Sequence, residues 1–214
     1  MQRLQFIKHS SLLLMGASTL FSCKQSDINE TIITTEDNSC DSTPSDALGP
    51  YYIGDTDQIN DINTAQMSGI KMLVTGGVYV DSTIKQKIEN AKIEIWHADH
   101  QGTYHPQARG DTSDFEPEQI NLRGTVVTNK NGLYAFNSIR PGLYNPRPRH
   151  IHFIISAPGY KRVVTQTYFK NDDSNSSERI EDNIDNCLII DFSIDSDDLL
   201  TGNIDFFLQP EDAN

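Results

Sequence analysis

Short runs of β-branched and aromatic residues, separated by turn residues, constrain the fold of this chain more than any other feature. They occupy residues 72–80, 92–96, 125–128, 134–136, 150–155 and 162–168. Several runs alternate apolar and polar residues, which is typical of strands with one buried face. Asn131-Gly132 predicts a hairpin turn between two of them. No segment shows a sustained helical period. We therefore expect an all-β domain, a single prealbumin- or immunoglobulin-like β-sandwich of short, mostly antiparallel strands.

The first residues have the pattern of an export signal. Arg3 and Lys8 precede an apolar stretch, residues 10–21, that is too short to cross a hydrocarbon core of roughly 30 Å as a helix. The stretch ends in Ser22-Cys23, which resembles the bacterial lipoprotein signal, where the cysteine is lipidated. We expect residues 1–22 to be a lipoprotein signal peptide and Cys23 to carry the lipid. The protein would then be an exported bacterial lipoprotein, anchored to a periplasm-facing or cell-surface membrane. A plain secretory signal with an incidental Cys23 is the alternative.

The rest of the chain divides into a tether and one domain. Residues 23–45 are polar, rich in Ser, Thr, Asn, Asp and Glu, and predict a flexible tether. Residues 46–210 have room for one ordinary domain with a full hydrophobic core. The net charge of -13 repels nucleic acid and anionic headgroups, so we expect no nucleic-acid partner and membrane attachment through the lipid alone. In an oxidising compartment Cys40 and Cys187 either form a disulfide or remain two free thiols.

His150-Ile151-His152 is the first candidate for chemistry. Alternate residues of a strand point to the same face, so the two imidazoles can share one metal ion. Arg147 and Arg149 flank the pair, and Tyr144 follows a Pro-Gly turn upstream. Two cations beside a bare di-histidine site are costly unless anions are present, and phenolates, a hydroxide or an anionic substrate would supply them.

The sequence resembles the intradiol ring-cleavage dioxygenases, the family of the catechol and protocatechuate 3,4-dioxygenases. Five stretches carry the resemblance, in this order: Leu48 to Tyr52, Ala91 to Tyr104, Leu122-Arg123-Gly124 with Thr128, Gly132, Tyr134 and Phe136, Ile139 to Phe153, and Thr165 to Phe169. Each motif is modest alone, but five in the right order make the match specific. The resemblance runs from about Leu48 to Leu208.

The resemblance implies a non-haem Fe(III) site with two tyrosines and two histidines. Carried over by motif, these ligands are Tyr104, Tyr144, His150 and His152. Fe(III) is a hard cation that favours anionic oxygen, and coordination removes the phenol proton. By the same resemblance Tyr144 is the labile ligand, which leaves when a catechol binds and takes up a catechol proton.

The resemblance also implies a reaction and two further catalytic residues. The expected reaction inserts O₂ between the two hydroxyl-bearing carbons of a catechol-type aromatic and gives a muconate-type diacid, with no organic cofactor. The matching arginine, Arg147, would stabilise negative charge developing on the substrate ring. Gln166 matches a glutamine near the substrate pocket. Tyr51 and Tyr52 lie where the family's N-terminal segment approaches the site.

Several of these residues also have ordinary structural interpretations. Trp96 is expected in the core. Three histidines around Tyr104 are expected to be solvated or to support the ligands, with His105 the strongest candidate for a role: His97, His100 and His105. Arg149 is expected to pair with an acid, and residues 172–185 to form a solvated acidic loop.

The chain departs from the well-studied enzymes of the family in two ways. Only two residues separate Tyr144 from Arg147, where those enzymes carry a longer loop. The helical N-terminal region that catechol dioxygenases use to dimerise is missing. Both departures leave open which aromatic diol is the substrate and whether the protein is a monomer or a homo-oligomer.

Two other classes of function compete with the dioxygenase. A non-catalytic, membrane-tethered β-sandwich binding module would need neither iron nor Tyr104 and Tyr144. A zinc hydrolase built on His150 and His152 would need a carboxylate or third histidine as ligand and a general base.

Overall fold

Strand pairing organises the described part of the chain. A computed structural model describes residues 40–80, 82, 85–143, 147–170, 172 and 184–211, which all belong to a unit spanning Asp37–Asn214. Cys23, Tyr144 and most of the predicted acidic loop lie outside the described residues. No helix in the described ranges has the length and apolar character needed to cross a membrane.

The strands are short, as predicted. They are β1 (Ile53–Gly54), β2 (Lys71–Tyr79), β3 (Lys92–Trp96), β4 (Gly110–Asp111), β5 (Arg123–Val127), β6 (Leu133–Ile139), β7 (His150–Ser156), β8 (Val163–Phe169), β9 (Ile189–Ile190), β10 (Ser193–Ile194), β11 (Leu200–Asn203) and β12 (Phe206–Phe207). The described helical elements are single 3₁₀ turns: η1 (Thr112–Asp114), η2 (Pro117–Gln119) and η4 (Asn186–Leu188).

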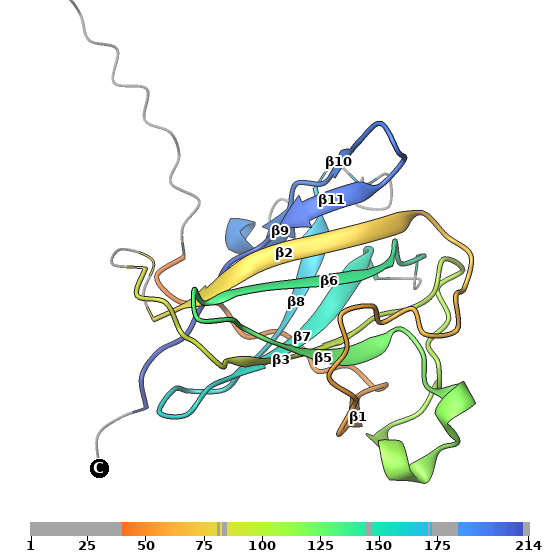
Figure 1. Ribbon diagram of the computed structural model, residues 1–214, viewed down its shortest axis with the longest axis horizontal. Helices are drawn as coiled ribbons and strands as arrows, with labels where there is room; N and C mark the ends of the chain where they lie inside the picture. Colours follow the sequence, from red (N-terminus) through yellow and green to blue (C-terminus); the bar gives the residue numbers. More distant parts are fainter. Residues whose placement is uncertain are drawn as a thin grey trace, which may run out of the picture. The chain divides into compact units, whose positions relative to one another are not determined.

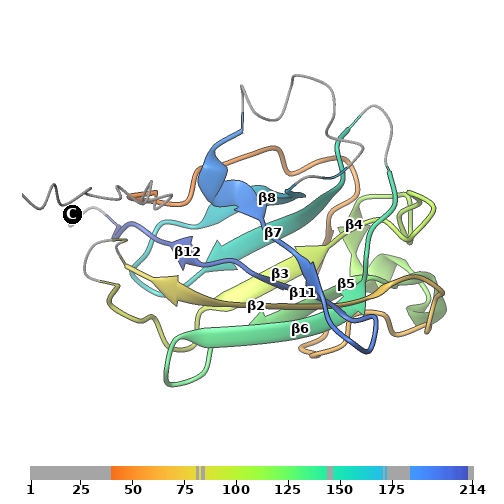
Figure 2. The ribbon, with the colours of Figure 1, turned by 90° about the horizontal axis from the view of Figure 1, so that it is seen from above.

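Two sheets form a β-sandwich, which confirms the predicted fold class (Figures 1 and 2). In the first sheet β6 lies antiparallel to β2, while β11 and β12 lie parallel to its other edge and β10 pairs with β11. The second sheet has the order β5-β3-β7-β8-β9, antiparallel except for the parallel pair β8–β9.

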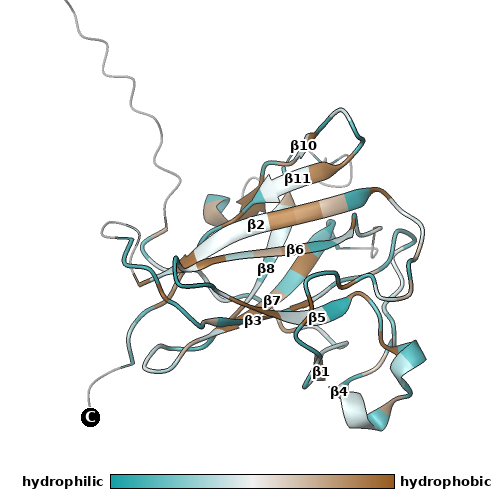
Figure 3. Ribbon diagram, in the orientation of Figure 1, coloured by the Kyte–Doolittle hydropathy of each residue, from teal (hydrophilic) through white to brown (hydrophobic). Residues whose placement is uncertain are grey.

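The main hydrophobic core fills the space between these sheets. In β6 the burial alternates, with Tyr134 and Phe136 buried and Leu133 and Ala135 exposed, as expected for a strand with one face toward a core. Phe153 packs against Phe136 and against Phe206, with ring centroids 6.1 Å and 5.1 Å apart. Figure 3 shows the hydrophobic residues along β2 and β7 that contribute to this core.

The Asn131-Gly132 turn forms, but the predicted hairpin is wrong. Gly132 adopts a φ of +69° and donates its N–H to the Asn129 carbonyl at 2.8 Å. The turn joins β5 to β6, and these strands belong to different sheets. Val126 and Phe136 both face the shared core, so the two strands pack across it and do not pair edge to edge.

Cys40 and Cys187 form a disulfide, with Cα atoms 5.9 Å apart, so the first of the two alternatives holds. The bridge ties the start of the described chain to η4. A few residues later the Thr43 N–H donates to the Phe207 carbonyl at 2.9 Å. The N-terminal arm is therefore fastened to late parts of the chain at two points.

Residues 46–59, which we call the covering segment, cross the outer face of the second sheet. The Asp46 N–H donates to the Val164 carbonyl of β8 at 2.9 Å. At the other end the Ile59 N–H donates to the Thr125 carbonyl of β5 at 3.0 Å. Beneath the segment lies a second, smaller hydrophobic cluster that includes Trp96 and Tyr104.

Candidate metal centre

His150 and His152 lie at the start of β7 and point to the outer face of the second sheet. Both are buried, and their ring centroids are 4.8 Å apart. Their neighbours in register are Tyr168 and Gln166 of β8. The alternation predicted from His-x-His therefore places both imidazoles under the covering segment.

Tyr104 brings its phenol oxygen to both imidazoles. Its Oη lies 3.1 Å from Nε2 of His150 and 3.0 Å from Nε2 of His152. Tyr104 comes from the loop after β3, some 46 residues before His150 in the sequence. The structure thus brings three of the four predicted ligands to one point, while Tyr144 lies outside the described residues.

Asp99 shapes the loop that carries Tyr104. Its carboxylate accepts the Thr103 N–H at 2.9 Å and faces Nε2 of His105 at 2.8 Å, on either side of Tyr104. Burial opposes ionisation of Asp99, but the hydrogen bonds from His105 and Thr103 outweigh it and hold the pKa of the carboxyl below its usual value. Asp99 is therefore a loop-organising carboxylate, which the sequence interpretation did not single out.

Both histidines are neutral, so each ring has one unprotonated nitrogen that can coordinate a metal ion. Burial is the main cause that lowers the pKa of His150 to about 4 and the pKa of His152 well below its ordinary value. Nδ1 of His150 faces the Pro148 carbonyl at 2.6 Å and must carry the hydrogen, which leaves Nε2 as the lone-pair atom toward Tyr104. Nδ1 of His152 is buried without a hydrogen-bond partner among the described residues.

Gly49 lets the covering segment approach His152 closely. A Cβ at this position would stand 2.9 Å from Cε1 and 3.4 Å from Nε2 of the imidazole, and the φ of Gly49 is +74°. Trp96 stacks on the same imidazole with centroids 4.8 Å apart and planes 5° apart. Trp96 is buried as expected, but it belongs to the outer cluster and not to the core between the sheets.

The two tyrosines of the covering segment pack against the site, as the resemblance suggested. The Tyr51 ring lies 4.7 Å from the Tyr104 ring. Tyr52 packs edge-on to Trp96 and donates its hydroxyl to Glu94 at 2.5 Å. Burial, followed by this hydrogen bond, raises the pKa of Tyr52. Tyr52 is therefore held protonated by a carboxylate of β3.

Arg147 and Gln166, the two predicted catalytic residues, contact each other. Nη2 of Arg147 donates to Oε1 of Gln166 at 2.8 Å and to the Tyr168 hydroxyl at 3.0 Å. The Tyr168 hydroxyl in turn donates to Asp46 at 2.6 Å, and Nε2 of Gln166 donates to the Ala47 carbonyl at 2.5 Å. A polar chain thus joins Arg147 to the start of the covering segment. Tyr168 was noticed only as part of the family stretch Thr165 to Phe169, and Asp46 carried no signal in the sequence, because their contact is between distant residues.

Arg123, at the start of β5, lies beside the ring of Tyr104. Its Cζ is 5.9 Å from the ring centroid, and the side chain is almost fully buried. Burial is the main cause that lowers the pKa of this guanidinium to about 10, and the interaction with Tyr104 opposes the shift. The residue was noticed in the sequence only as part of a family motif.

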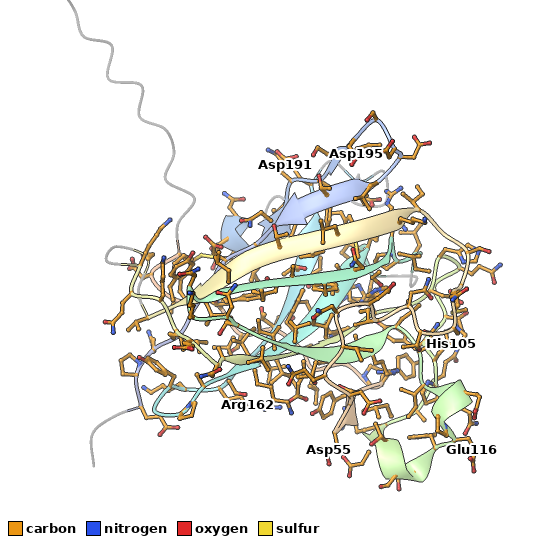
Figure 4. The ribbon with its side chains drawn as sticks, in the orientation of Figure 1. Asp55, His105, Glu116, Arg162, Asp191 and Asp195 are labelled. Atoms are coloured by element: carbon orange, nitrogen blue, oxygen red, sulfur yellow. A yellow bond between two sulfur atoms is a disulfide. The ribbon has the colours of Figure 1, made fainter. Side chains whose placement is uncertain are left out.

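The remaining histidines take different roles from one another. His97 is fully buried and faces the Ala98 carbonyl and the Ser138 hydroxyl at 2.7 Å each, so of the two expected alternatives it is not the solvated one. His100 is exposed. His105, labelled in Figure 4, supports the Tyr104 loop through Asp99.

Arg149 pairs with an acid, as expected. Its Nε donates to Asp172 at 2.5 Å, and Arg140 donates to the same carboxylate at 2.8 Å. Asp172 is buried between the two arginines, so this first residue of the predicted solvated loop is part of the folded structure.

The donor atoms at this point can be compared with the ligands that different metals favour. Within the described ranges, no carboxylate or third histidine joins His150 and His152, and the one cysteine–carboxylate group found contains the Cys40–Cys187 disulfide. Two neutral imidazoles and one phenol oxygen remain. These donors fit a ferric ion, which favours anionic oxygen, and do not match the ligand set of a hydrolytic zinc site.

Comparison with known proteins gives a consistent result. The sequence model of the family Dioxygenase_C, described as "Dioxygenase", matches residues 47–210. Catechol 1,2-dioxygenase of Candida albicans is 31% identical over 169 residues, which is 66% of this chain and 54% of that protein. The chain spans about half the length of the curated relatives that it matches.

The solved structures that this chain matches include two that are covered to 98% or more of their length. The dioxygenase domain of a dioxygenase–carbohydrate-binding protein fusion from Streptomyces sp. SirexAA-E has a TM-score of 0.65 and 26% identity, covering 80% of this chain and 100% of that one. An intradiol ring-cleavage dioxygenase from Tetranychus urticae has a TM-score of 0.64 and 26% identity, covering 82% of this chain and 98% of that one.

Proposed function

The chain belongs to the intradiol ring-cleavage dioxygenase family, and we propose that it cleaves a catechol-type aromatic between its two hydroxyl-bearing carbons. Both atoms of one O₂ enter each product, which is a muconate-type diacid. The observation that carries the proposal is the convergence of the Tyr104 Oη with Nε2 of His150 and of His152, at 3.1 Å and 3.0 Å.

We propose that this point holds Fe(III) through Tyr104, His150 and His152. Tyr144 is the fourth ligand in this proposal, on the strength of its sequence motif. A ferric ion held there would supply the Lewis acidity that makes a bound catechol reactive toward O₂. The neutral imidazoles and an ionised Tyr104 give this ion the donor atoms it favours.

The chain's own residues bind and orient the substrate. Arg147 holds a fixed positive charge, positioned by Gln166 and the Tyr168 hydroxyl, that stabilises negative charge developing on the ring. The covering segment places Tyr51 against Tyr104 and shields the site from bulk water. By family resemblance, the Tyr144 oxygen takes up one proton of the bound diol.

A visible absorption spectrum of the purified protein, with iron quantified on the same sample, tests this proposal first. We expect about one iron per chain and a broad tyrosinate-to-ferric charge-transfer band that shifts when a catechol binds. Catechol, a chlorocatechol and hydroxyquinol, the substrates in the names of the relatives, form the first panel.

Oxygen uptake and product analysis then separate an enzyme from a metal-binding relic. One O₂ consumed per ring-opened diacid would support intradiol cleavage. A protein that stays colourless after loading with ferric ion would remove the dioxygenase and leave the non-catalytic binding module in its place.

We also propose that the protein is exported and anchored through a lipid on Cys23. The disulfide between Cys40 and Cys187 supports this placement, because structural disulfides persist in oxidising compartments. In cells fed labelled palmitate, we expect label on the wild-type chain and its recovery with membranes. Replacing Cys23 by serine should abolish both, and label that survives this change would contradict the anchor.

A further inference from the structure

Arg123 is a buried cation without a buried carboxylate beside it in the described structure. The residue is 3% exposed, and each hydrogen bond of its guanidinium goes to a backbone carbonyl. Nε donates to His105 at 2.9 Å, Nη2 donates to Pro106 at 2.9 Å, and Nη1 donates to Tyr51. Carbonyl dipoles satisfy the donors, but they carry no compensating net charge.

A buried charge without an opposite charge destabilises the folded protein, and an anion that forms beside the cation offsets part of that cost. The ionisable group whose charge acts on this guanidinium is the phenol of Tyr104, whose ring centroid is 5.9 Å from the guanidinium carbon. Tyr104 is also the residue at which the ferric site needs an ionised oxygen. The buried guanidinium lacks an anion, and the ferric site needs one at Tyr104, so a single ionised phenol meets both requirements.

The position of Arg123 is fixed by the same residues that flank Tyr104. His105 and Pro106 follow Tyr104 directly, and Tyr51 packs its ring against the Tyr104 ring at 4.7 Å. Arg123 itself starts β5 and pairs in register with Trp96, which stacks on His152. The guanidinium therefore cannot move relative to the ligand without breaking hydrogen bonds to two backbone segments, residues 105–106 and Tyr51.

We propose that Arg123 is a positioning residue that supplies the fixed counter-charge for an ionised, metal-bound Tyr104. This inference rests on the proposed ferric site and adds a residue that sets its electronic properties. A cation beside the phenolate lowers the energy of the oxygen electrons that are transferred to the metal in this absorption band. Its removal should bring the tyrosinate-to-ferric transition to lower energy and make the ferric state harder to reduce.

Two variants, one that removes the positive charge and one that keeps it, test the proposal in the iron-loaded protein. Arg123→Gln removes the charge and keeps one hydrogen-bonding group, while Arg123→Lys keeps the charge and loses the guanidinium fork. We expect the charge-transfer band of Arg123→Gln to move to longer wavelength by on the order of 20 nm, with a lower reduction potential. The band of Arg123→Lys should stay close to that of wild type. Lys130→Gln, which removes an exposed cation in the turn between β5 and β6, is the control and should shift neither quantity.

The outcomes separate this inference from the proposed function. A wild-type protein without any charge-transfer band overturns both. A wild-type band with an unshifted band in a folded Arg123→Gln overturns the counter-charge alone, as does an Arg123→Lys variant shifted as far as Arg123→Gln. If near-UV circular dichroism shows that Arg123→Gln does not fold, Arg123→Lys provides the test. A charge-transfer band at the wild-type position in Arg123→Lys supports the counter-charge role of Arg123, and a displaced band overturns it.

Discussion

At the scale of single residues, the space left at Gly49 sets how closely the covering segment approaches a proposed ligand. We expect Gly49→Ala to lower iron occupancy and reduce turnover at least tenfold, because the added Cβ would stand 2.9 Å from the His152 imidazole. Gly159→Ala is the matched control, because its φ of +80° gives a similar backbone strain of about 1 kcal/mol while nothing lies within 4 Å. Iron per chain and the melting temperature of both variants check the prediction. Equal iron loading in the two would show that the contact does not matter.

Arg147 is the residue whose charge should act on the reaction and not on the metal. We expect Arg147→Gln to lower kcat/KM by about 10²-fold or more, while iron content and the colour of the resting protein stay unchanged. Arg147→Lys keeps a charge but cannot donate to Gln166 and Tyr168 in the same geometry, so an intermediate loss is expected. Steady-state oxygen uptake measures both. Loss of iron in Arg147→Gln would instead assign the residue a structural role.

Residues of the site differ in how visible they are in the sequence. His150 and His152 could be placed on one face because strand periodicity alone requires it. Tyr104 needed the family motif, since nothing local shows that a loop 46 residues earlier returns to β7. Asp99 and Asp46 could not be found, because their partners are defined only by tertiary contacts.

At the scale of elements, the covering segment depends on the bridge that fastens the arm before it. Replacing both Cys40 and Cys187 by serine should destabilise the domain by about 2–4 kcal/mol. We expect faster hydrogen exchange at the Asp46 amide, which lies six residues after Cys40 and bonds Val164, than at the Ile59 amide, which bonds Thr125 at the far end of the segment. Denaturant unfolding and exchange mass spectrometry measure these effects. Uniform acceleration at both amides would show that the bridge stabilises the whole domain and not this segment in particular.

The strands that sequence analysis located are those with a continuous apolar face. The expected runs at 92–96 and 150–155 coincide closely with β3 and β7, because both have an apolar face buried in the sandwich. β11 was missed, since Leu200–Asn203 contains a glycine and polar residues and becomes a strand only by pairing with β2. The same limit explains the failed hairpin, because turn residues specify a reversal of the chain but not the sheet that each strand joins.

At the scale of the whole molecule, buried neutral histidines couple stability to pH. Burial lowers the pKa of His97 from 6.5 to about 4, so between these values the unfolded chain binds more protons than the folded one. The free energy of unfolding should therefore fall as the pH drops through this window, by up to about 1.4 kcal/mol per pH unit from His97. Below the folded-state pKa this dependence ends, and above 6.5 the stabilisation is complete.

His97→Gln should lower this slope by up to about 1.4 kcal/mol per pH unit, because glutamine can occupy the site beside Ser138 without titrating, while His150 and His152 keep their own contributions. Urea unfolding of metal-free wild type and variant between about pH 7 and pH 4.5 gives the two slopes. Exposed His100 offers the control, and His100→Gln should keep the wild-type slope. Parallel slopes for wild type and His97→Gln would assign the pH dependence to other groups.

The pairing of early with late chain segments has a consequence for biosynthesis. Cys40 meets Cys187 across 147 positions, and β2 receives β11 and β12 along one edge. A nascent chain that has emerged only as far as β8 already contains every described residue of the proposed centre. The partners that fasten the N-terminal arm and complete the first sheet are not yet available to it. A closed centre therefore assembles only after the C-terminal segments have joined the fold, and a truncated chain would carry the reactive side chains without the enclosure that makes them selective.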